Sequence, residues 1–126
     1  MNLNGSQSEQ AEGGFAPLPD ADALDGLLAR SHDVPVLLFL HDPYCPISRR
    51  AWGEMQQLAA GPLLDAYLVN VSRQHDLSDA IAARTGVRHE SPQALVLRDG
   101  KAVWDASHFS ITAQAVGSAL AGSVQK

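Results

Sequence analysis

The sequence has one cysteine, Cys45, among its 126 residues. A single thiol rules out an internal disulfide, a Cys-x-x-Cys redox pair and any zinc or iron–sulfur site built from several cysteines. Basic residues are also few: nine Lys and Arg against 14 Asp and Glu give a formal net charge of −5. A negative chain lacks the basic surface that binds nucleic acid or an anionic membrane, so we expect neither as a partner.

Long apolar runs are missing as well. No stretch approaches the roughly 18 consecutive apolar residues of a membrane span. Residues 1–19 contain no basic residue and no apolar core, so they do not have the pattern of a secretory signal. Because small and polar residues dominate this segment, we expect 1–19 to be a disordered tail and 20–126 to be the folded domain. We expect a cytoplasmic protein, where thiols stay reduced.

Apolar periodicity predicts one α/β domain. Helical spacing occurs at 20–31, 46–60, 77–85 and 113–121, and strand-like runs occur at 34–41, 66–72, 93–99 and 101–106. We expect Asp20, Asp76 and Thr112 to cap helices, and Asp99-Gly100 to form a tight hairpin turn. The run 34–41 has no polar alternation, which is typical of a strand covered on both faces. The order resembles a thioredoxin-like three-layer fold, with a four-stranded mixed central sheet flanked by helices and an extra N-terminal helix.

Cys45 lies in the segment HDPYCPIS, where the first strand gives way to a helix that Pro46 is suited to start. Unpaired N–H groups and the helix dipole favour the thiolate at such a position. We expect Arg49 to add positive charge, and Ser48 to donate a hydrogen bond to the sulfur. A hydroxyl cannot resolve a mixed disulfide, so the chemistry is limited to one cysteine. The plain alternatives are an inert buried thiol and a capping role for Ser48.

A second motif, RHESPQ, covers residues 88–93. In a thioredoxin-type fold this is the place of a proline with a cis peptide bond, so we expect cis Ser91-Pro92. The backbone beside such a proline can pair with an extended substrate, and His89 would organise the loop ahead of it. The alternative is an ordinary trans loop proline.

YCPIS (44–48), RHESPQ (88–93) and ASHFSIT (106–112) together resemble the monothiol bacilliredoxin family over about residues 20–122. The resemblance implies a thiol–disulfide oxidoreductase in which Cys45 attacks S-bacillithiolated proteins, takes the bacillithiol onto itself and frees the client thiol. It implies that Ser48 stands where dithiol relatives carry cysteine, and that Tyr44, His89, Ser91 and Pro92 form the substrate site. It further implies no bound cofactor, bacillithiol as co-substrate, and recycling by a second bacillithiol or a reductase.

The histidines, arginines and tryptophans are further candidates for roles at this site. The histidines do not pair at metal-binding spacing, so we expect no metal site. His41 or His89 could approach Cys45. Arg49, Arg50 and Arg88 are candidates to bind the carboxylates that bacillithiol carries on its malate, or are simply surface charges. Trp52 and Trp104 are expected in the core.

Two other function classes remain open from the residues alone. One is a cysteine hydrolase with Cys45 as nucleophile and a histidine as base, although no signature of an oriented base or an oxyanion hole is recognisable. The other is a thioredoxin-like binding or chaperone module in which Cys45 is only modified. Replacement of Cys45 by Ser tests these alternatives, because only thiol–disulfide exchange requires the thiol for release of bacillithiol from a client.

Overall fold

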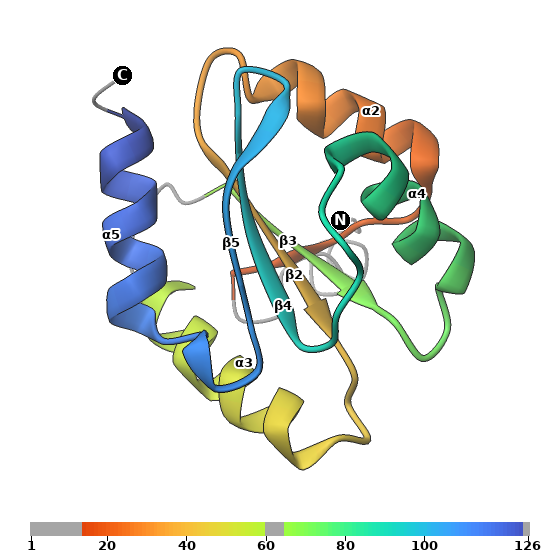
Figure 1. Ribbon diagram of the computed structural model, residues 1–126, viewed down its shortest axis with the longest axis vertical. Coiled ribbons are helices and arrows are strands. Elements are labelled where there is room, and N and C mark those ends of the chain that lie inside the picture. The colour runs from red at the N-terminus through yellow and green to blue at the C-terminus, as the bar shows by residue number, and fades with distance from the viewer. Residues whose placement is uncertain (1–13, 60–64, 125–126) are drawn as a thin grey trace, which may run out of the picture.

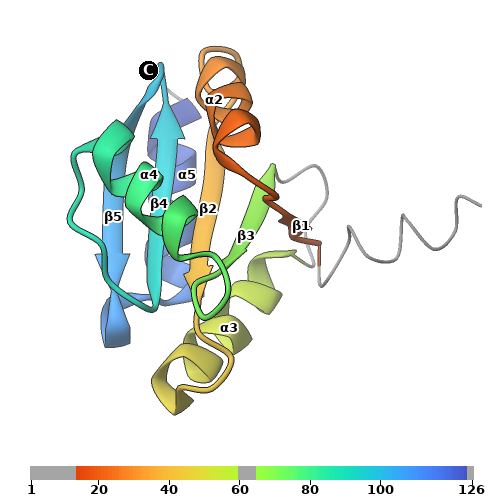
Figure 2. The same cartoon turned by 90° about the vertical axis from the view of Figure 1, so that its right-hand side faces the viewer.

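The structure is a computed structural model that describes residues 14–59 and 65–124. Its elements run β1 (Ala16–Pro17), α2 (Ala21–Arg30), β2 (Val36–His41), α3 (Pro46–Ala59), β3 (Ala66–Asn70), α4 (His75–Thr85), β4 (Gln93–Arg98), β5 (Lys101–Ser107), a 3₁₀ turn η1 (His108–Ser110) and α5 (Ala113–Val124). The strands form one mixed sheet in the order β1-β3-β2-β4-β5 (Figure 2). β1, β3 and β2 are parallel, whereas β4 and β5 are antiparallel to their neighbours. The expected three-layer α/β fold is confirmed.

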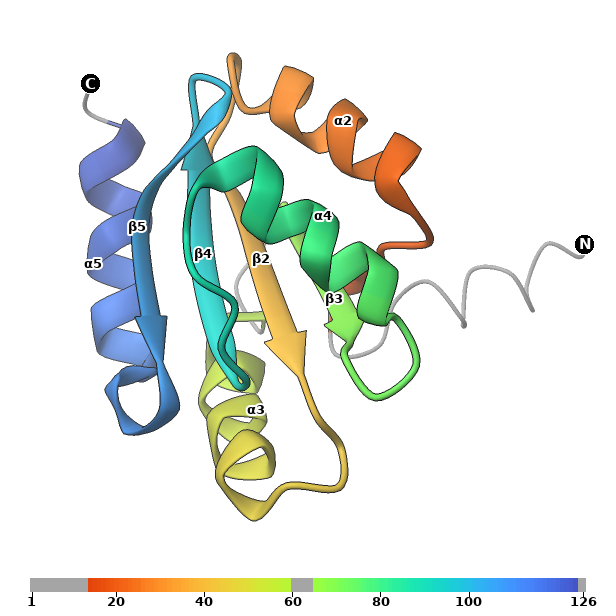
Figure 3. The ribbon, with the colours of Figure 1, turned by 45° about the vertical axis from the view of Figure 1, so that its right-hand side comes forward.

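Helices cover both faces of the sheet. α3 and α5 lie on one face and α2 and α4 on the other, as Figures 1 and 3 show. The central strand β2 is buried at all six positions because it serves both layers. Leu38 and Leu40 point into the core under α2 and α4, while Leu37 and Phe39 point into the core under α3 and α5. The period of two in a strand therefore directs His41, the last residue of β2, to the side of α3.

Local signals position most element ends as expected. Asp20 caps α2, and its side chain accepts a hydrogen bond from the Ala23 N–H at 2.9 Å. Thr112 caps α5 by accepting from the Ala115 N–H at 3.1 Å. Asp99 and Gly100 both have positive φ, 59° and 79°, which is the backbone of a type I′ hairpin turn. The expectation for Asp76 is wrong, because α4 begins earlier and Gln74 occupies its N-cap position.

The sheet has a fifth strand that the sequence analysis did not predict. β1 pairs with β3 inside the segment assigned to the tail, so the folded part begins before residue 20. Phe15 is fully buried, with its ring centroid 5.2 Å from that of Trp52, and Leu18 is also buried on the opposite face. A strand of two residues is too short to show the alternation of apolar and polar side chains that predicts a strand. Because the preceding residues are mostly polar, the whole segment 1–19 has the composition of a disordered tail. Residues 1–13 of the expected tail, and residue 60 of the expected helix 46–60, lie outside the described residues.

Within residues 14–59 and 65–124, no helix combines the length and the apolar character needed to cross a lipid bilayer.

Candidate functional site

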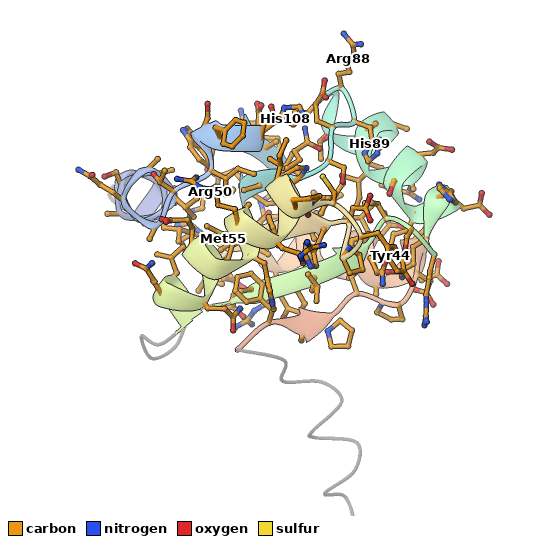
Figure 4. All side chains as sticks on the ribbon, turned by 90° about the horizontal axis from the view of Figure 1, so that it is seen from below. Tyr44, Arg50, Met55, Arg88, His89 and His108 are labelled. Carbon is orange, nitrogen blue, oxygen red and sulfur yellow. The ribbon has the colours of Figure 1, made fainter. Side chains whose placement is uncertain are left out.

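Strand register brings three distant segments to one end of the sheet. Leu40 pairs with Gln93, so the loop that follows β2 lies beside the loop that precedes β4. Gln93 also pairs with Ser107, which brings η1 to the same end. Figure 4 looks onto this end: Tyr44 lies near the start of α3, His89 and His108 lie on the other side of that helix end, and Arg88 projects outward beyond His89. The segments of both sequence motifs therefore lie at the same end of the sheet.

Cys45 occupies the last position before α3 and is partly exposed. Its N–H donates to the Asp42 carbonyl at 3.1 Å, closing a tight turn, and its own carbonyl accepts from the Arg49 N–H at 3.0 Å. The second bond is the first of the helix, so Cys45 stands at the N-cap position and Pro46 is the first helical residue, as expected. Cys45 is thus a partly exposed residue at the positive end of the helix dipole.

The Ser48 hydroxyl links the end of β2 to the first turn of α3. Ser48 is fully buried, and its Oγ lies 2.7 Å from His41 Nδ1 and accepts from the Asp42 N–H at 2.8 Å. The expected hydrogen bond from this hydroxyl to the Cys45 sulfur is not what the structure has; its bonds go to His41 and Asp42 instead. The reason is geometric, because a residue in the first turn of α3 faces the end of the strand beneath it. Ser48 therefore ties the end of β2 to the first turn of α3, on either side of the loop that carries Cys45.

His41 is buried beside two aromatic rings, which also stack on each other. Its ring stacks on Trp52, with centroids 5.4 Å apart, and on Phe39, with centroids 5.5 Å apart. Burial lowers the pKa of His41 below the usual histidine value; the nearby Arg49 guanidinium acts in the same direction and the Asp42 carboxylate opposes it. A neutral His41 can accept the Ser48 hydroxyl proton at Nδ1, which satisfies both groups. Its ring is thus engaged with Ser48, and the structure gives it no ion pair with Cys45 within the residues described.

The arginines of the first turn of α3 take different directions. Arg49 folds back, and its Nη1 donates to the Pro43 carbonyl at 3.3 Å, which keeps a positive charge over the loop that carries Cys45. Arg50 instead lies over the ring of Phe109, 5.7 Å from the centroid. Tyr44 is 76% exposed, and its N–H donates to the Asp42 carboxylate.

The loop that precedes β4 is held by a side chain. The peptide bond between Ser91 and Pro92 is cis. Gln93, buried beneath the loop, donates from Nε2 to the Arg88 carbonyl at 2.9 Å, and its Oε1 accepts from the Glu90 N–H. The Ser91 hydroxyl is buried and has no hydrogen-bond partner among the described residues.

Two groups at this end were not singled out from the sequence. One is Gln93, whose side chain is hydrogen-bonded to the loop before β4. The sequence shows only a polar residue at the start of an apolar strand, which does not predict these bonds. The other is the turn His108-Phe109, whose His108 N–H donates to the Pro92 carbonyl at 3.1 Å. The motif ASHFSIT contained this turn, but only the strand register shows that it adjoins Pro92. His89, by contrast, is exposed and has no described side-chain bond.

A surface hollow of about 470 Å³ lies away from the Cys45 loop, and residues at the starts of α2 and α4 line it, among them Asp20, Gln74 and Leu77. Among residues 14–59 and 65–124, no three His, Cys, Asp or Glu side chains gather as a metal site would require. At the start of α3, the side chain suited to nucleophilic chemistry is the thiol of Cys45.

Comparisons with known proteins agree with this geometry. The model of the family described as "Monothiol bacilliredoxin BrxC" matches residues 16–116. A solved structure described as a candidate oxidoreductase with a thioredoxin fold is 31% identical, with a TM-score of 0.77 over 85% of this chain and 94% of that one. The thioredoxin of Malassezia sympodialis is 15% identical, with a TM-score of 0.68 over 90% and 93% of the two chains. Fasciola hepatica thioredoxin is 18% identical, with a TM-score of 0.66 over 85% and 97%. The last two show the fold alone.

Proposed function

Since the chain belongs to the monothiol bacilliredoxin family, we propose that it removes bacillithiol from S-bacillithiolated proteins by thiol–disulfide exchange at Cys45. The coarser assignment, a thioredoxin-like redox protein, rests on the family and on the 31% identical relative. The observation that supports the removal of bacillithiol in particular is the position of Cys45. This partly exposed residue starts a helix beside the loop that contains cis Pro92.

The exchange is a displacement at sulfur. The Cys45 thiolate attacks the bacillithiol sulfur of the mixed disulfide, a new disulfide forms between Cys45 and bacillithiol, and the client sulfur leaves as a thiolate that takes up a proton. No net oxidation occurs, because one disulfide replaces another. A second bacillithiol, or a reductase, then attacks the mixed disulfide on Cys45 and regenerates the thiol. The step needs a reduced Cys45, which places the protein in the cytoplasm in this proposal.

The surrounding residues have separate parts in this proposal. The N–H groups at the start of α3, which Pro46 opens, and the charge of Arg49 stabilise the thiolate. The backbone beside Pro92, flanked by Tyr44 and His89, pairs with the client segment. Arg49 or Arg88 would bind the carboxylates of bacillithiol in this proposal.

The test follows Cys45 by intact mass. Reduced protein is mixed with a peptide whose one cysteine carries bacillithiol, and the same peptide carrying glutathione serves as comparison. We expect transfer of one bacillithiol to the protein with release of the free peptide, and faster transfer from the bacillithiol peptide. Cys45→Ser should show neither transfer nor release. Undiminished release by Cys45→Ser would refute the proposal, and binding of the peptide without any transfer would favour the binding-module alternative.

A further inference from the structure

Two large apolar side chains are exposed at the end of the sheet that carries Cys45. Tyr44 is 76% exposed and Phe109 is 62% exposed. Single exposed apolar residues are ordinary on a protein surface, and Figure 4 shows Tyr44 and Arg50, the residue that contacts the Phe109 ring, on opposite sides of α3, so each ring is judged by its own neighbours. Tyr44 precedes Cys45 directly, whereas Phe109 comes from η1. The two rings thus come from segments far apart in the sequence.

The turn that carries Phe109 is anchored on both sides of the ring. His108 has a positive φ of 55°, and its N–H is bonded to the Pro92 carbonyl. Ile111 is fully buried beneath the turn and donates its N–H to the His108 carbonyl. Phe109 is therefore presented outward on a fixed turn that adjoins the loop of Pro92. A fixed aromatic ring loses little conformational entropy when a partner covers it.

Arg50 completes this surface from α3. Its guanidinium lies 5.7 Å from the centroid of the Phe109 ring, within the range of a cation–π contact. Of the other two arginines near the site, Arg49 is bonded to the Pro43 carbonyl and Arg88 lies 3.9 Å from Glu90. No carboxylate pairs with Arg50 among the described salt bridges. A guanidinium stacked on a ring keeps its N–H groups free for a planar carboxylate.

The carboxylates at this end of the sheet are already engaged, whereas Arg50 is not. Asp42 accepts the Tyr44 N–H, Glu54 accepts the Ala113 N–H at 2.8 Å, and Glu90 lies 3.9 Å from Arg88 and from His108. The guanidinium of Arg50 is therefore the positive group beside Phe109 that a carboxylate from outside can meet. Complementary charge of this kind steers association and selects partners more than it raises affinity. The partner that fits is acidic and presents an apolar group.

We propose that Arg50 and Phe109 form a docking surface for the client polypeptide, which selects segments with an acidic side chain and an apolar neighbour close to the modified cysteine. The inference rests on the function proposed above and adds the kind of client. The occupant is the client and not bacillithiol, because carboxylates of a small thiol would use Arg50 but would leave the exposed Phe109 ring uncovered.

The experiment compares two peptides that differ only by Glu or Lys two residues from a bacillithiolated cysteine, both with a Leu beside that position. The rate constant for transfer to Cys45 is measured for each at low ionic strength. We expect the Glu peptide to react about tenfold faster with the wild type, and Arg50→Glu to reverse this preference. Arg73→Glu, the same charge change in the turn before α4, is the matched control and should keep the preference. Phe109→Ala should slow both peptides.

Several outcomes would overturn the docking surface. Equal rates for the Glu and Lys peptides with the wild type would do so, and so would equal effects of Arg50→Glu and Arg73→Glu. A third substrate, the symmetrical disulfide of bacillithiol, separates the two sources of carboxylate. Equal slowing of this small disulfide by Arg50→Glu would assign Arg50 to bacillithiol. Lack of transfer from every substrate would instead refute the proposed function itself, and the docking surface with it.

Discussion

The Ser48 hydroxyl lies 2.7 Å from His41 Nδ1, and this hydrogen bond joins the last residue of β2 to the first turn of α3. The loop between these two residues carries Cys45. Both partners are buried, with 0% of Ser48 and 8% of His41 exposed, so water does not compete strongly for the bond. The same hydroxyl accepts the Asp42 N–H, which fixes the backbone where it leaves the strand. The loop that carries Cys45 is therefore fixed by hydrogen bonds between the end of β2 and the first turn of α3.

Loss of the Ser48 hydroxyl should destabilise the protein. Ser48→Ala leaves the Asp42 N–H and His41 Nδ1 without their partner, and we expect a loss of about 1–3 kcal/mol in the free energy of unfolding. Ser118→Ala, at an exposed serine of α5, is the control and should stay near zero. Urea denaturation of Ser48→Ala, His41→Phe and the double variant measures the coupling between the two residues. Additive losses would show that the bond contributes nothing.

The rate of exchange at Cys45 should depend on an acceptor at position 41 more than on a ring. His41→Phe keeps an aromatic ring beside Trp52 and Phe39 but removes Nδ1, whereas His41→Asn keeps an acceptor and removes the ring. We expect His41→Phe to react about tenfold more slowly than the wild type, an effect of ~1.4 kcal/mol. His41→Asn should keep more of the rate, even though it packs less well. A faster His41→Phe than His41→Asn would contradict the positioning role of the bond.

Stability should fall in mild acid because of His41. Burial lowers the pKa of His41 in the folded protein, so the unfolded chain binds a proton first as the pH drops through about 6.5. The contribution of neutral His41 is present above that pH and is lost as the pH falls through the lower, folded-state pKa. Unfolding free energies measured between about pH 7.5 and 5 should therefore decrease less in His41→Phe than in the wild type. Parallel curves for the two proteins would exclude His41 as the cause.

Phe15 should prove to be part of the core. Its ring is fully buried against Trp52 and Phe39. We expect Phe15→Ala to lower the free energy of unfolding by about 3–5 kcal/mol, the range for a buried aromatic residue. Phe109→Ala is the matched control, because the same change at an exposed ring should cost no more than about 0.5 kcal/mol. Similar values for the two variants would mean that residues 14–19 do not belong to the folded domain.

Patterns within a few residues were sufficient for much of this protein. The apolar run 34–41 predicted a strand buried on both faces, and the structure has β2 at the centre of the sheet. Asp99-Gly100 predicted the hairpin, and Pro46 after Cys45 predicted a helix that begins at the thiol. These signals are readable in one sequence because turn geometry, helix capping and strand alternation depend on neighbouring residues.

The side-chain contacts of the site residues depend on the tertiary structure. Ser48 bonds His41 and not Cys45, Arg50 stacks on Phe109, and Gln93 braces the loop that contains Pro92. Phe15 joined the core although its neighbours look like a polar tail. Each of these contacts depends on which strands lie side by side and in which register, and that alignment is set by burial over the whole sheet. The composition of a short segment does not determine this alignment, so these contacts could not be predicted from the sequence alone.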